Sequence, residues 1–178
     1  MEHDRAGFAN RRASLVVVVA TTLILIGVGA LLALRSDDTT EAARRTRQAV
    51  VESRGADVMP FDQSKTTHTF DTTSEGGVET VTANDPGDET QIALIRMHLA
   101  HESQLFAAGD FTDPATIHGE NMPGLAELQR SANEIEFAYV DVPRGAAITY
   151  RTTNPALVTA LHTWFDAQLN DHGRHAHG

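Results

Sequence analysis

Residues 88–109, DETQIALIRMHLAHESQLFAAG, decide the fold. Asp88 is a typical N-cap and Gly109 a typical C-terminal stop, so the stretch predicts one long helix over residues 89–108. At about 100° per residue, its aliphatic and aromatic side chains gather on one face. We therefore expect this helix to lie against an apolar surface that other segments supply.

Segments rich in Thr, Val and aromatic residues flank the long helix on both sides. THTFDTTSEGGVETVTA, residues 67–83, predicts two short strands around a turn at Gly76–Gly77. EIEFAYVDVPRGAAITYR, residues 134–151, repeats the alternation, with Pro143 and Gly145 in the turn. Both segments are therefore expected to be β-hairpins.

Two further helices complete the predicted domain. A short helix is expected after Pro123, and a last one begins at Asn154 as N-cap with Pro155 in its first position. The resulting order, ββααββα, is typical of an α+β domain of two layers. We predict an antiparallel four-stranded sheet with the helices on one face.

The N-terminal part contains an apolar segment without charge, ASLVVVVATTLILIGVGALLAL, residues 13–34. It is long enough to cross a bilayer and too long for the core of a cleaved signal peptide, so it predicts one transmembrane helix that acts as a signal anchor. Arginines flank this segment on both sides, so counting positive charges does not decide its orientation in the membrane. The Arg11–Arg12 pair and the short N-terminal tail favour a cytoplasmic N-terminus.

These features divide the chain into five parts. The predicted division is a cytoplasmic tail at 1–12, a transmembrane helix at 13–34, a juxtamembrane linker at 35–58, an extracytoplasmic α+β domain at 59–173 and a histidine-containing tail at 174–178. The formal net charge is −10, which excludes nucleic acid as an expected partner. No cysteine is present, so any metal ion must be held by His, Met, carboxylate or backbone oxygen.

The long helix places two polar side chains in the face that should be buried. His98 and Glu102 fall inside its apolar arc, and His101 falls on the edge of that arc. Burial of an unpaired carboxylate is costly, so the two groups either hydrogen-bond each other or a strand backbone, or belong to a metal site. In a metal site, Glu102 and His101 would support the ligands.

Other candidate ligands lie in different segments. His68 alternates with Phe70 on the first strand, and His162 lies at the margin of the apolar stripe of the last helix. His118 and Met122 stand four residues apart in IHGENMPG, residues 117–124, which suits a soft or borderline ion, with copper favoured and zinc as the alternative. The other interpretation of this loop is a turn in which Met122 is a core side chain.

The tail histidines are expected to be solvated. His172 is the exception, because one more turn of the last helix would carry it over the buried stripe.

Four stretches carry a resemblance to a known family: IRMHLAHES, GDFTDPATIHGENMPGL, ITYRTTNPALV and ALHTWFDAQLNDHG. They resemble small bacterial exported or membrane-anchored proteins that are often labelled aspartate carbamoyltransferase by automatic naming. The resemblance covers about residues 60–173 and implies that His98, His118, Met122 and His162 belong to a recurring pattern, to which it assigns no role. A true carbamoyltransferase is longer and has a Ser-Thr-Arg-Thr-Arg phosphate-binding loop, which this chain lacks.

The leading hypothesis is a membrane-anchored extracytoplasmic domain that binds a transition metal as a sensor, carrier or buffer. The expected ligands are His68, His98, His118, Met122 and His162. One alternative is a module that binds a protein partner in the cell envelope without metal, and another is a small hydrolase or haem-binding protein. No nucleophile stands beside a general base in the sequence, so catalysis has no positive support.

Overall fold

A computed structural model of the chain describes residues 39–173 and 176–178. The chain divides into two compact units, residues 1–45 and 46–178. In the first, residues 39–45 are helical and Glu41 forms ion pairs with Arg44 and Arg45. The predicted transmembrane helix lies outside the described residues. Within 39–173 and 176–178, no helix is both long enough and apolar enough to cross a membrane.

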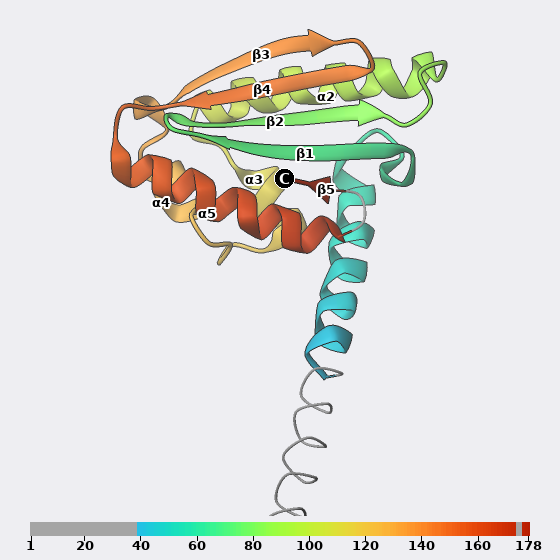
Figure 1. Cartoon of the computed structure of the whole chain (residues 1–178), viewed down its shortest axis with the longest axis horizontal. Helices are drawn as coiled ribbons and strands as arrows, with labels where there is room; N and C mark the ends of the chain where they lie inside the picture. Colours follow the sequence, from blue (N-terminus) through green and yellow to red (C-terminus); the bar gives the residue numbers. More distant parts are fainter. Residues whose placement is uncertain (1–38, 174–175) are drawn as a thin grey trace, which may run out of the picture. The chain divides into compact units, whose positions relative to one another are not determined.

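The second unit contains one mixed sheet of five strands in the order β3-β4-β2-β1-β5 (Figure 1). The strands are β1 (Thr66–Thr73), β2 (Gly76–Ala83), β3 (Glu136–Val142), β4 (Gly145–Arg151) and β5 (Ala176–His177). All neighbours are antiparallel except β5, which pairs with β1 in parallel. The α+β class is thus confirmed, and the prediction of a purely antiparallel four-stranded sheet is corrected. The strand β5 has two residues, which is too short for the alternation of polar and apolar residues by which a strand is predicted from sequence.

The two predicted hairpins are present, with a difference in the first turn. Ser74 and Glu75 form that turn, whereas Gly76 is the first residue of β2 with φ of +144°. A Cβ atom on Gly76 would lie 2.1 Å from the carbonyl oxygen of Tyr150, so glycine is required here by close approach of two strands.

Besides the helical residues 46–58, the second unit contains the α-helices α2 (Glu89–Ala107), α3 (Thr112–His118), α4 (Leu125–Arg130) and α5 (Pro155–His172), with short 3₁₀ turns η1 (Gln63–Lys65) and η2 (Ala132–Glu134). The predicted caps are confirmed, because Asp88 accepts a hydrogen bond from Gln91 N–H and Asn154 accepts one from Ala156 N–H. Helix α3 was not predicted. It has only two turns, and its N-cap residue Phe111 makes no side-chain capping bond.

The two long helices pack on the same face of the sheet. Helix α2 lies over β2, β3 and β4, and α5 lies over β1 and β2. Phe106 of α2 meets Trp164 of α5 edge-to-face at 6.1 Å between centroids, and both rings contact Tyr150 of β4. This arrangement agrees with the predicted two layers and places the core between the sheet and these helices.

The domain begins earlier in the chain than the sequence indicated. Residues 46–58, assigned above to a linker, are helical and belong to the same compact unit as the sheet. Val51 is 2% exposed and is part of the hydrophobic core, whereas its neighbour Val50 is 43% exposed. A single inward-facing valine among charged residues is only weak evidence, in the sequence, for a helix that packs on the core.

Two adjacent valines test whether this helix belongs to the domain. We expect Val51→Ala to lower the free energy of unfolding by about 1–2 kcal/mol, because it removes two buried methyl groups. Val50→Ala is the matched control and should change it by less than about 0.5 kcal/mol. Urea unfolding of the full-length chain measures both. Equal effects of the two substitutions would contradict the placement of Val51 in the core.

Candidate functional site

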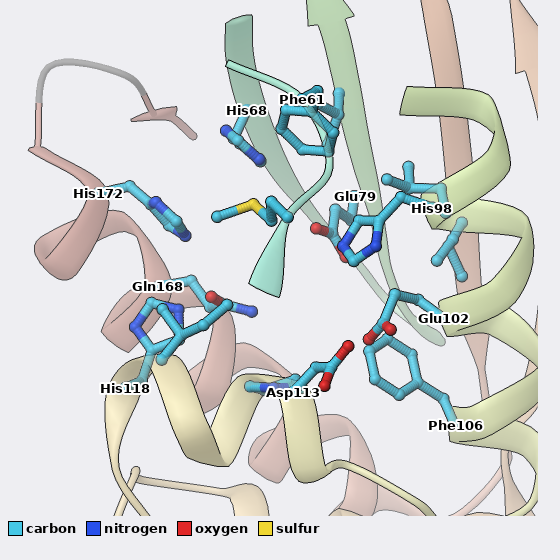
Figure 2. A pocket seen from close by; sticks show the side chains of 16 residues that line it. Phe61, His68, Glu79, His98, Glu102, Phe106, Asp113, His118, Gln168 and His172 are labelled. Atoms are coloured by element: carbon cyan, nitrogen blue, oxygen red, sulfur yellow. The ribbon is translucent and has the colours of Figure 1, made fainter. Parts of the chain in front are cut away.

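A pocket of about 50 Å³ lies where β1, β2, α2, α3 and α5 meet (Figure 2). Its polar lining includes four histidines, His68, His98, His118 and His172. It also includes three acidic residues, Glu79, Glu102 and Asp113, together with Gln168. Apolar side chains, among them Met59 and Phe61, complete the wall. The volume is sufficient for an ion with a few water molecules, and haem or a drug-sized ligand needs several hundred Å³.

Local periodicity directs these side chains into the pocket. His68 points to the helices because it shares a face of β1 with the buried Phe70. On α2, His98 and Glu102 are one turn apart and therefore lie on the same side of that helix. Gln168 and His172 have the same spacing on the last turns of α5.

Three imidazole rings form a cluster at one side of the pocket, as Figure 2 shows. The centroid of His172 lies 4.8 Å from that of His68, with the two rings nearly parallel. It lies 5.0 Å from that of His118, with the two rings almost perpendicular. These residues come from β1, α3 and α5, so only the folded chain brings them together.

His118 is held by a buried carboxylate. Its Nδ1 lies 2.9 Å from Oδ2 of Asp171, and both residues are at most 5% exposed. Arg47 donates to both oxygens of Asp171, at 2.5 and 2.6 Å, and to the carbonyl oxygen of His118. Burial acts to raise the pKa of Asp171, but the hydrogen bonds from His118 and Arg47 outweigh burial and lower it.

The carboxylate also determines the tautomer of His118. Because an ionised Asp171 can only accept, Nδ1 carries a proton, so in the neutral ring Nε2 is the nitrogen with the lone pair. Carboxylates orient metal-binding histidines in the same way.

Carboxyl groups gather at the other side of the pocket, and Figure 2 shows Glu102 and Asp113 directed toward each other. Burial, the charge of Asp113 and a hydrogen bond with Asp113 raise the pKa of Glu102 to about 9. Burial also raises the pKa of Glu79, although the hydroxyl group of Tyr150, at 2.6 Å, opposes this by donating to it. At neutral pH, Glu102 therefore keeps a proton.

His98 lies near these carboxyl groups. Burial lowers its pKa, whereas the charge of Asp113 acts in the opposite direction. The ring is consequently neutral at pH 7, and it packs edge-to-face on Phe61 at 5.6 Å.

The polar lining lacks permanent positive charge. Among the described residues that line the pocket there is no lysine or arginine. Over residues 39–173 and 176–178, no group of three or more His, Asp and Glu side chains has the spacing that holds a metal ion.

The structure brings together four of the seven residues that the sequence singled out. His68, His98, His118 and Glu102 line the pocket. His162 does not line it, and its Nε2 lies 2.9 and 3.0 Å from the carbonyl oxygens of Gly76 and Thr73. His101 is exposed.

The loop IHGENMPG separates its two candidate ligands. His118 ends α3 on the pocket, whereas Met122 is 4% exposed in the hydrophobic core and is not among the lining residues. Gly119 and Gly124, with φ of +95° and +80°, permit the tight path between them. The thioether that lines the pocket belongs to Met59 instead.

Four contributors were not proposed from the sequence: Arg47, Glu79, Asp113 and Asp171. Glu79 could have been recognised from the sequence as inward-facing, because it alternates with Val81 on a strand whose inner face is buried. The other three had none, because their roles depend on contacts between distant segments. His172 was expected over the buried stripe only if the last helix continued by a turn, and α5 does extend to it.

No family model, no curated protein and no solved structure matches this chain.

The pair of carboxyl groups predicts an unusual dependence of stability on pH. A carboxyl group whose pKa is higher in the folded than in the unfolded chain favours folding most below its ordinary pKa of 4.5, and that benefit is lost as the pH rises toward 9. We expect the wild-type free energy of unfolding to fall over this window. Glu102→Gln should remove this decrease, so its free energy of unfolding should exceed that of the wild type by about 2–3 kcal/mol at pH 7.

Urea unfolding at pH 5, 7 and 9 measures this difference. The exposed Glu120→Gln should follow the wild-type curve. A Glu102→Gln curve parallel to that of the wild type would show that Glu102 is not protonated in the folded domain.

Asp171 should contribute far more to the stability of the domain than a neighbouring acidic residue on the same helix. We expect Asp171→Ala to lower the free energy of unfolding by about 2–3 kcal/mol, because the buried Nδ1 of His118 loses its acceptor. The exposed Asp166→Ala should change it by less than about 0.5 kcal/mol. Thermal and urea unfolding compare the two, and a small effect at Asp171 would contradict the contact with His118.

Proposed function

We propose that this domain binds a late transition metal ion, copper or zinc, through His68, His118 and His172. The observation that carries the proposal is the orientation of His118 by Asp171 beside two other imidazoles. A neutral imidazole with its Nδ1–H on a carboxylate presents Nε2 as a ligand, and the carboxylate increases its basicity.

Two of the separations among the three rings are close to those expected for a shared ion. Two imidazoles bound to one tetrahedral ion at about 2.1 Å have ring centroids about 5 Å apart. The centroid distances from His172 to its two neighbours are 4.8 and 5.0 Å. Because the rings of His68 and His172 are now stacked at 9°, binding requires at least one of them to turn.

The lining favours an ion over the other kinds of ligand considered. A volume of about 50 Å³ is small for haem or for most organic substrates. Imidazole nitrogen is a preferred donor for both copper and zinc. Met59 adds a thioether to the wall, which would favour copper in its reduced state.

The cellular role that we propose combines this site with the apolar segment at residues 13–34. The domain would lie outside the cytoplasm, tethered by one N-terminal helix, and act as a sensor, carrier or buffer of the metal. The negative net charge is consistent with attraction of cations to its surface.

Titration calorimetry of the purified full-length chain with Zn²⁺ and Cu²⁺ tests the site. All proteins carry His175→Ala and His177→Ala, so that tail histidines do not contribute. We expect one equivalent to bind, His118→Ala to weaken binding by at least about 100-fold, and Asp171→Asn to weaken it by about 10- to 100-fold.

His162→Ala and His101→Ala are the matched controls, because they remove imidazoles that do not line the pocket. Both should leave the affinity within about two-fold of the parent protein. Absence of binding, or equal losses in all histidine variants, would refute the proposed site and direct attention to a protein partner instead.

A further inference from the structure

The carboxyl side of the pocket contains a buried oxygen atom with no partner. Glu102 is 5% exposed and lines the pocket, and its Oε1 makes no hydrogen bond. Its carboxyl group also pairs with Asp113 through a side-chain hydrogen bond. A buried carboxyl oxygen without a donor is costly, and native structures rarely keep one without a functional reason.

Two nearby acidic groups make a positively charged partner for Glu102 more favourable. Glu79 lies close enough for its charge to act on Glu102, as does that of Asp113. Arg47 is engaged with Asp171 and does not line the pocket. The carboxyl groups thus face the cavity without a compensating side chain on the described part of its wall.

A neutral nitrogen donor is available beside these oxygens. His98 lines the same pocket one helical turn from Glu102, and it senses the charge of Asp113. A ring nitrogen of neutral imidazole is a common ligand of metal ions.

We infer that Glu102, Asp113 and His98 form a second cation site, separate from the imidazole cluster, for a divalent metal ion that prefers oxygen ligands. Carboxylate and water oxygens with one imidazole suit Mn²⁺ and similar ions better than copper. The ion would lie beside Glu102 in the pocket, and it would replace the proton of Glu102. Because the three side chains do not have the spacing of a metal site in this structure, they would have to close around the ion, and water molecules would complete its coordination.

This inference stands without the imidazole site, because none of its three ligands belongs to that site. The two differ in donor chemistry, since one offers mainly nitrogen and the other mainly oxygen.

Electron paramagnetic resonance with Mn²⁺ tests the inference on the full-length chain with His175→Ala and His177→Ala. Free Mn²⁺ gives a strong signal that falls when the ion binds, so a titration counts bound ions. We expect one equivalent to bind. Glu102→Gln and Asp113→Asn should each weaken binding at least ten-fold, and both nearly preserve side-chain size.

The controls are His118→Ala, at the imidazole cluster, and Glu120→Gln, an exposed acid. Both should leave Mn²⁺ binding within two-fold of the parent protein. Circular dichroism during thermal unfolding establishes that each variant is folded before its affinity is compared. In the parent protein, pulsed measurements should detect one bound nitrogen nucleus, and His98→Ala should remove it.

Three results would overturn the inference. No binding of Mn²⁺, or binding that survives both carboxyl substitutions, would show that these groups do not hold a cation. Loss of Mn²⁺ in His118→Ala would mean that the pocket holds one shared ion. Binding of zinc or copper without Mn²⁺ would refute this second site while leaving the imidazole site intact.

Discussion

The carboxylate of Asp171 joins three segments that are far apart in the chain. It accepts hydrogen bonds from Arg47 and His118 and lies in the last turn of α5. Because it is only 5% exposed, its charge must be paired inside the protein. That requirement ties residues 46–58 and the end of α3 to the end of α5. It also places His172, the next residue, beside His118.

The charge balance of the pocket is a second constraint on the domain. The described lining provides acidic groups and imidazoles but no lysine or arginine. A proton on Glu102 neutralises part of this charge at neutral pH, as its pKa of about 9 indicates. The proposed metal sites rest on these same acidic groups and imidazoles. Strongly perturbed pKa values of this kind are common at functional sites.

Much of the site could be predicted from local patterns. The Asp88 cap and the apolar arc of α2 placed His98 and Glu102 toward the interior, and alternation with Phe70 did the same for His68. Asp113 could not be found in this way, because α3 is short and its start carries no capping bond. Arg47 was missed for a related reason: the sequence around it resembles a charged linker, and its contacts with Asp171 and with the carbonyl oxygen of His118 give it its place in the domain.

By itself, the sequence determined the α+β class, the two hairpins, the long helices and the inward direction of several polar side chains. Only the tertiary structure decided which of these side chains meet. His118 and Met122 are four residues apart, yet one lines the pocket and the other does not. His118 and Asp171 are distant in the chain and in contact. The reason is physical. The direction in which a side chain points follows from the periodicity of its own helix or strand, whereas its neighbours across the core depend on how separate elements pack.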